Sequence, residues 1–167
     1  MLGDVTPEDL SPEHSHWKAR AALTDAFFWD ASDDTAPFGS ETGRDVLEAF
    51  RDFRDEHPRE SPIQLLDELL ARWEVVNDHW DAVEADDVQA IGEDDEYSLL
   101  TRDEAVIALA FAQIVVEGKV DPEARRRAVF ALKRQSLPAL LHAWGERRIQ
   151  RAARVERMTA VLVSPWG

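Results

Sequence analysis

Four stretches of the chain carry the residue order that begins an α-helix, and they constrain the fold more than any other feature. Each places a Ser, Thr or Asp directly before a proline. Such a residue accepts hydrogen bonds from the free N–H groups of the first turn, and proline fits the first helical position, where its missing N–H is not needed. No alternating apolar run is long enough for a sheet, although residues 26–30 and 160–163 could form short extended segments. We therefore expect an all-α fold. The four sites are Thr6-Pro7, Ser11-Pro12, Ser61-Pro62 and Asp121-Pro122.

Apolar residues at helical spacing place about six helices in one bundle. In the stretch AVIALAFA, residues 105–112, apolar side chains occur on every side of the helix. A helix of this kind is surrounded by others, and Gly118 stands where a left-handed cap would end it. We expect one domain over 1–167, with residues 1–11 as a flexible arm and residues 77–100 as an irregular acidic connector. The expected helices lie at 12–24, 43–56, 61–76, 102–117, from 121 and from 137, with a break at Gly145.

The formal charge of the chain is −15 and is unevenly distributed. Residues 1–104 carry 29 Asp and Glu against 8 Lys and Arg, whereas residues 105–167 carry 5 against 11. Either the basic C-terminal third packs against the acidic remainder, or the acidic surface faces a basic partner. We favour internal packing, because it needs no partner. Nucleic acid is disfavoured, since most of the surface would repel its phosphates.

Cysteine is absent, which excludes disulfides, thiolate metal sites and a cysteine nucleophile. The first ten residues carry neither a basic segment nor an apolar run, and AVIALAFA is too short to span a bilayer. We expect a cytoplasmic protein without a membrane segment. Established motifs for zinc, nucleotide or serine-hydrolase chemistry are missing. The sequence therefore predicts no cofactor, and it favours a non-enzyme.

The segment FFWDASDDTAPFGSETG, residues 27–43, combines aromatic rings, carboxylates and glycines. Pro37 fixes its own backbone, Gly39 and Gly43 permit conformations that other residues avoid, and a serine or threonine can cap the next helix. Trp29 and Phe38, with two further phenylalanines, are too apolar to leave in water. We therefore predict a structured turn, named here the P-F-G loop, pinned to the core.

The carboxylates of the P-F-G loop allow a second interpretation. Asp30, Asp33, Asp34 and Glu41 are oxygen ligands of the kind that Mg²⁺ and Ca²⁺ prefer. Their spacing fits no established calcium loop, and carboxylates near a helix start are favourable without any metal. The alternative hypothesis is a metal-dependent hydrolase that uses these four residues.

An acidic surface is expected around residues 77–96, which contain no Lys or Arg. Exposed tryptophan beside carboxylates is a common form of interaction hot spot. The residues expected to contact a basic partner are Trp80, Asp86, Asp87, Asp94 and Asp95.

The remaining tryptophans and the basic run are interpreted structurally. Trp17, Trp73 and Trp144 lie inside helical patterns and should anchor helices, whereas Trp166 should be partly exposed. Three adjacent arginines, residues 125–127, lie near the start of an expected helix, as basic residues do in a DNA recognition helix. Adjacent residues point in different directions around a helix, so the three arginines would not share one face. We expect them to pair within the protein.

Two stretches resemble the YfeS-like group of uncharacterised bacterial proteins. The first is F-W-D, then D-D, A-P-F-G and a second glycine that opens a helix, and the second is ALAFAQIVVEGKVDPEARRRAVFALKRQ, residues 108–135. The resemblance implies a bacterial cytosolic protein and supplies no established reaction or catalytic residue. Our leading hypothesis is a non-catalytic interaction module, a regulator or an immunity-type inhibitor, that presents an acidic surface to a basic partner. Outward-facing acids on a filled core would favour it over the hydrolase.

Overall fold

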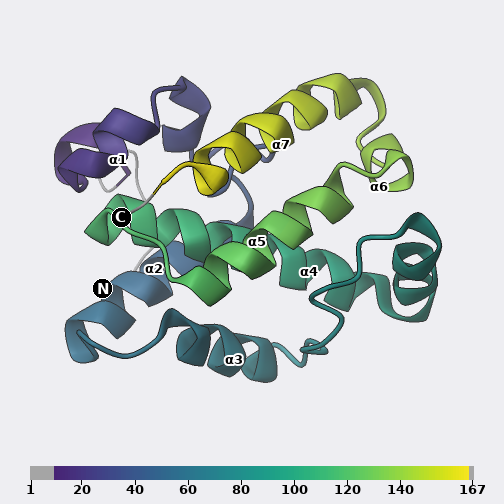
Figure 1. The fold of residues 1–167 in the computed structure, drawn as a ribbon, viewed down its shortest axis with the longest axis horizontal. Helices are drawn as coiled ribbons and strands as arrows, with labels where there is room; N and C mark the ends of the chain where they lie inside the picture. Colours follow the sequence, from purple (N-terminus) through teal and green to yellow (C-terminus); the bar gives the residue numbers. More distant parts are fainter. Residues whose placement is uncertain (1–9, 166–167) are drawn as a thin grey trace.

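The computed structural model describes residues 10–165, and this part of the chain contains helices, turns and loops but no strand (Figure 1). The all-α prediction is confirmed. Both segments left open as extended, 26–30 and 160–163, fall largely within helical elements, and the break at Gly145 is confirmed by its φ of 59°. The elements are η1 (Pro12–His14), α1 (Trp17–Ala22), η2 (Ala26–Trp29), α2 (Glu41–Glu56), α3 (Pro62–Arg72), α4 (Ala85–Glu117), α5 (Pro122–Gln135), α6 (Pro138–His142), η3 (Gly145–Arg147) and α7 (Arg148–Val163).

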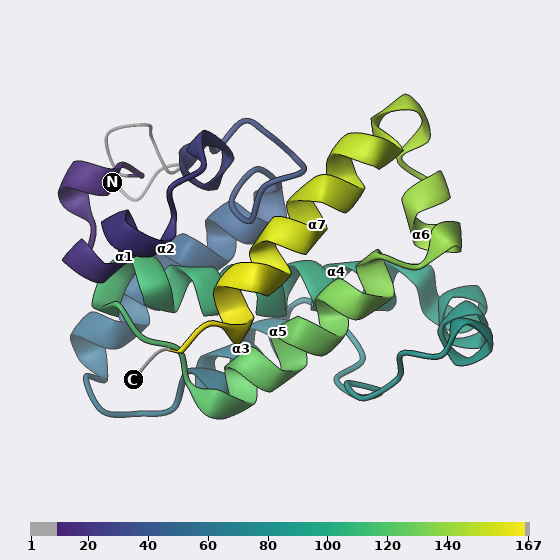
Figure 2. The ribbon, with the colours of Figure 1, turned by 45° about the horizontal axis from the view of Figure 1, so that its top comes forward.

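Helix α4 is the centre of the bundle. It packs most extensively against α2 and α5, while α3 covers one edge and α7 runs beside α5 (Figures 1 and 2). Residues 105–115 of α4 are all buried, which confirms the expected buried helix. The helix ends at Gly118, whose φ is 67°. A Cβ atom there would lie 2.3 Å from Nδ1 of His16, so glycine is needed for both backbone and packing.

The start of α4 differs from the prediction. Residues 77–84 are irregular, as expected, but helix begins at Ala85, well before the expected start at residue 102. Asp95 interrupts the helix with φ −155° and ψ 84°. Its carboxylate accepts hydrogen bonds from the N–H (3.0 Å) and the hydroxyl (2.7 Å) of Ser98. Asp95 therefore acts as an N-cap for the second part of α4, and the predicted irregular connector 77–100 is wrong from residue 85 onward.

The three phenylalanines of the P-F-G loop are buried, as predicted, and Trp29 is half-buried. Phe27, Phe28 and Phe38 are at most 7% exposed, and Phe28 stacks on Phe111 of α4 with ring centroids 5.4 Å apart. Trp29 donates from Nε1 to a main-chain oxygen at the end of α1, at 2.9 Å. These contacts attach the loop to the centre of the bundle.

The turn that follows depends on a cap and a glycine. Ser40 Oγ accepts a hydrogen bond from the N–H of Gly43 at 3.0 Å, so the serine caps α2 as expected. A Cβ atom at Gly43 would lie 2.2 Å from the carbonyl oxygen of Pro37. The glycine thus allows the first turn of α2 to touch the loop before it.

The N-terminal expectations are only partly correct. In place of one helix over 12–24, the chain forms the short η1 and α1, separated at Ser15. Of the expected flexible arm 1–11, residues 1–9 lie outside the described part of the chain. Leu10 is 2% exposed and belongs to the core, so the arm does not extend to residue 11.

Candidate functional site

The carboxylates around the P-F-G loop are held by arginines of the C-terminal part of the chain. Arg154 of α7 donates to Asp33 at 3.2 Å, and Arg147 pairs with both Asp33 and Asp34. Arg157 pairs with Asp25 at 2.9 Å. The basic C-terminal part therefore packs against acidic residues near the N-terminus, as the preferred explanation of the charge division predicted.

This arrangement gives no support to the hydrolase alternative. Asp30 accepts hydrogen bonds from the N–H and hydroxyl of Ser32, and these bonds lower its pKa. Glu41 occupies the first turn of α2, where a carboxylate is favourable. Within residues 10–165, no three His, Asp or Glu side chains are grouped so that they could hold a metal ion.

The arginines at the start of α5 also have partners within the protein. Arg126 and Arg127 both donate to the Glu123 carboxylate, and these bonds lower its pKa to about 2. Arg126 additionally pairs with Asp81. The expected intramolecular pairing is confirmed for these two arginines, and it supplies Asp81 with a counter-ion that the local sequence lacks.

Trp80 is buried within the protein, which leaves little of its side chain for the predicted contact with a partner. Its side chain is 8% exposed, and Nε1 donates to Oδ1 of Asn77 at 2.8 Å. The guanidinium groups of Arg102 and Arg127 lie 5.7 and 4.9 Å from the centre of a Trp80 ring. Cations from two helices therefore cover the position that a partner would need.

Among the other tryptophans, Trp17 differs from the prediction and two agree with it. Trp17, expected to anchor a helix, is 61% exposed. Trp73 is half-buried against the core, and Trp144 is half-buried beneath the Arg151 guanidinium, 4.9 Å from the ring centre, which agrees with an anchoring role. Trp166 lies outside the described residues.

A buried ion pair, which the sequence interpretation missed, holds the loop before α4. Asp103 of α4 and Arg134 of α5 are both fully buried, with Nη2 2.8 Å from Oδ1. Arg134 Nη1 also donates to the carbonyl oxygens of Trp80 (2.8 Å) and Ala82 (2.9 Å). Burial raises the pKa of the Asp103 carboxyl, and Arg134 and Gln135, which donates to it at 2.9 Å, oppose the rise. No local sequence signal marks this pair, because Asp103 and Arg134 each stand beside other charged residues in the chain.

An exposed acidic segment follows this anchored loop. We define it as residues 84–96, the first part of α4 and its bend. Asp86, Asp87 and Asp94 are exposed there, with Glu93 beside them. Asp95 belongs to the same segment, but its carboxylate caps the second part of α4. The hydrogen bonds that it accepts from Ser98 lower its pKa. Three of the four predicted aspartates therefore remain available at the surface.

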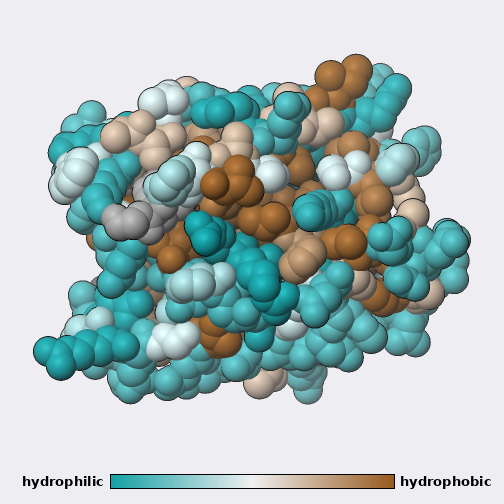
Figure 3. All heavy atoms as spheres, viewed as in Figure 1, coloured by the Kyte–Doolittle hydropathy of each residue, from teal (hydrophilic) through white to brown (hydrophobic). Residues whose placement is uncertain are grey.

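A groove of about 580 Å³ lies between the acidic segment and α6, and we call it the α4–α6 groove. Val88 and Leu99 are buried at its base, with exposures of 3% and 1%. Exposed Glu93 and Glu96 belong to the same wall. In Figure 3, brown apolar side chains are spread over the centre and right of the face, and some lie among hydrophilic ones on the side where Figure 1 shows α6 and the start of α4. The lining residues are Ala85, Val88, Gln89, Gly92, Glu93, Glu96, Leu99, Leu137, Pro138, Ala139 and Leu140.

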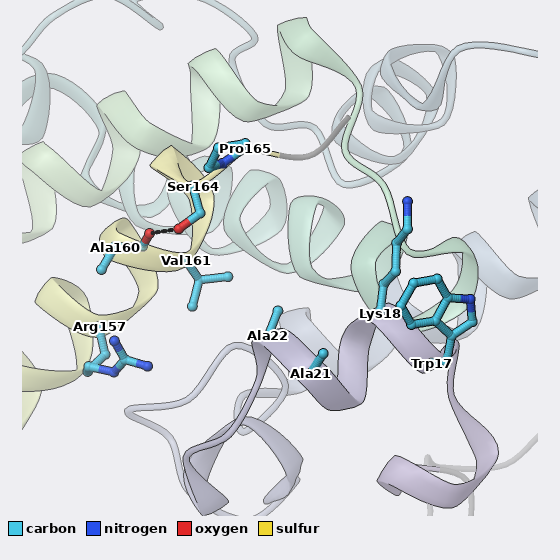
Figure 4. A pocket seen from close by; sticks show the side chains of 9 residues that line it. All are labelled: Trp17, Lys18, Ala21, Ala22, Arg157, Ala160, Val161, Ser164 and Pro165. Atoms are coloured by element: carbon cyan, nitrogen blue, oxygen red, sulfur yellow. Dashed lines mark hydrogen bonds between the residues drawn. The ribbon is translucent and has the colours of Figure 1, made fainter.

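A second pocket of about 560 Å³ lies between α1 and the end of α7 (Figure 4). Its polar groups already have partners. Arg157 pairs with Asp25, Ser164 Oγ donates to the oxygen of Ala160 at 2.8 Å, and the Lys18 ammonium lies 5.7 Å from a Trp17 ring centre. The pocket therefore offers no converging set of polar groups comparable to the acidic rim of the α4–α6 groove.

Fold and groove together define an all-helical protein with an apolar groove beside an acidic surface. The chain is similar to the uncharacterized protein YfeS of Escherichia coli (strain K12), with 28% identity over 141 residues. The match covers 82% of this chain, and the chain spans 57% of the length of that relative. The similarity supports the expected resemblance to the YfeS-like group.

Comparisons with protein-family models and with solved structures found no match. Among the helices formed by residues 10–165, none has the length and apolar character needed to cross a bilayer.

Proposed function

We propose that the protein is a non-catalytic interaction module that presents its acidic segment to a basic partner protein. The observation that carries the proposal is the exposure of Asp86, Asp87 and Asp94 in a stretch without Lys or Arg. Acidic residues elsewhere, such as Asp33 and Asp103, are instead held by arginines of the same chain. Within the acidic segment itself, no Lys or Arg compensates the negative charge.

Physical reasoning favours a binding role for such a segment. Like charges held close together repel one another, so they reduce the stability of the folded state. The same one-sign field attracts an oppositely charged partner and accelerates association at low ionic strength. In this role the protein is a bacterial cytoplasmic regulator, or an immunity-type inhibitor that covers a basic surface. The absence of cysteine suits a reducing compartment.

The test begins with capture of the partner from a bacterial lysate on the immobilised protein. Association rates are then measured by surface plasmon resonance at low and at physiological salt. A triple variant, Asp86→Asn with Asp87→Asn and Asp94→Asn, should associate at least about tenfold more slowly at low salt, because steering contributes about 10- to 1,000-fold. Its rate should also depend less on salt.

A matched control removes three negative charges elsewhere. Asp52→Asn, Asp55→Asn and Glu56→Gln change exposed positions of α2 and alter the net charge equally. This control should retain most of the association rate. Equal rates for both triple variants, or a wild-type rate that is indifferent to salt, would contradict the proposal.

A further inference from the structure

The geometry points to a specific form of partner: we propose that the α4–α6 groove receives the apolar face of a basic amphipathic helix. This inference rests on the proposed function and specifies how the partner binds. The groove has an apolar base, formed by Val88 and Leu99, next to the exposed carboxylates of Glu93 and Glu96. A complementary ligand must carry apolar side chains flanked by Lys or Arg, which is the composition of such a helix.

The charge around the groove selects its occupant. Gln89 Nε2 donates to Glu93 Oε1 at 3.0 Å, which orients that carboxylate at the groove wall. Asp86, Asp87 and Asp94 lie on the same helical segment and extend the negative field beyond the groove. A second copy of the acidic segment would meet it with the same charge, so a basic partner is favoured over self-association through these segments.

Gly92 provides an independent observation. It lines the groove from inside a helix, where glycine is less stable than alanine. Its φ is not in the left-handed region, and a Cβ atom would meet only Leu99 Cδ2, at an ordinary 3.4 Å. Neither the backbone nor the internal packing therefore requires glycine here. Because glycine has no side chain, the groove wall is lower at this position, and another chain can approach the backbone closely.

The shape of the groove favours a helix over an extended strand. Both walls, α4 and α6, are helices, and residues 10–165 form no sheet whose edge could pair with a strand. The volume of about 580 Å³ falls in the range of roughly 300–1,000 Å³ that holds ligands in proteins. It accommodates side chains of a helix that rests on the rim, in the helix-in-groove mode.

The test uses a labelled synthetic peptide of about 18 residues, long enough for partial helix formation. It carries Leu at every third or fourth position and Lys elsewhere. Three control peptides are a scrambled sequence of the same composition, an oligolysine of equal charge, and an amphipathic version with Gln in place of Lys. Binding is measured by fluorescence anisotropy at low and physiological salt. The amphipathic basic peptide should bind at least about tenfold more tightly than each control.

Groove variants locate the bound peptide. Gly92→Met and, as a second substitution on the opposite wall, Ala139→Met add apolar bulk to the groove and should weaken binding at least about fivefold, through faster dissociation. Ala90→Met changes an exposed position on the same segment that does not line the groove, and binding should stay within about twofold of wild type. Melting temperatures of all variants confirm that each is folded.

Two failures are distinguishable. If the scrambled peptide and oligolysine bind as tightly as the amphipathic peptide, and neither groove variant weakens binding, the groove inference is overturned while the acidic surface still binds basic ligands. If the Gln peptide binds as tightly as the Lys peptide, the partner is not basic. If, in addition, the triple amide variant at Asp86, Asp87 and Asp94 leaves every affinity unchanged, the proposed function fails as well.

Discussion

Replacing Asp103 with Asn should destabilise the protein severely, because it removes one charge of a buried pair while preserving side-chain volume. Arg134 would keep its hydrogen bonds to the carbonyl oxygens of Trp80 and Ala82 but lose its counter-charge at 2.8 Å. Breaking a fully buried pair from one side costs about 3–5 kcal/mol. For a protein of this size each kcal/mol lowers the melting temperature by about 2–4 °C, so we expect a fall of roughly 6–20 °C.

The assay is guanidinium denaturation followed by tryptophan fluorescence, together with thermal denaturation followed by circular dichroism. The matched control is Glu123→Gln, which breaks partly exposed pairs with Arg126 and Arg127 and should cost at most about 1 kcal/mol. The double change Asp103→Leu with Arg134→Met should recover much of the loss, because neither charge then stays buried alone. If Asp103→Asn costs no more than Glu123→Gln, the buried pair does not anchor the loop before α4 in the way described.

Two further predictions concern a glycine and an acid. Gly118→Ala should lower stability by about 2–4 kcal/mol in thermal denaturation, since its φ is 67° and the new Cβ would meet the His16 ring. Gly145→Ala, with φ 59° but no atom within 4 Å of the new Cβ, should cost only about 1–2 kcal/mol, and equal losses would contradict the packing argument. The pKa of Glu123 is lowered to about 2 from 4.5, so its contribution to stability is full above the unfolded pKa and disappears as pH falls through about 2. The stability difference between wild type and Glu123→Gln should therefore be largest near neutral pH and shrink toward pH 2, and a pH-independent difference would argue against these hydrogen bonds.

The parts of the fold that depend on neighbouring residues were predictable. Ser40, Ser61 and Asp121 cap α2, α3 and α5 through their side chains. Ser61 and Asp121 stand directly before proline, and Ser40 stands three residues before Gly43, so their positions indicated these caps. Gly118 ends α4 in the left-handed conformation for the same local reason. Buried apolar residues of α4 were also evident, because no polar face interrupts residues 105–112. Capping and periodicity act within a few residues, so one sequence reveals them.

The features that depend on contacts distant in sequence were not predictable in the same way. Trp17 and Trp80 occur in similar polar surroundings, and only the tertiary positions of Arg102 and Arg127 decide which of them is covered. The bend at Asp95 allows helix in a segment without a sustained apolar period, which is why that segment was expected to be irregular. For the candidate site, the acidic residues were identified from the sequence, whereas the groove required the position of α6.

The bend in α4 also separates what evolution can change from what it must keep. After the bend, residues 105–115 are enclosed by the rest of the bundle, and each substitution there would have to fit its neighbours. Before it, residues 85–94 anchor chiefly through Val88, and most of their side chains face solvent. Descendants of this chain could therefore revise the charges and contours of the first part, and with them the choice of partner, while inheriting the same core unchanged.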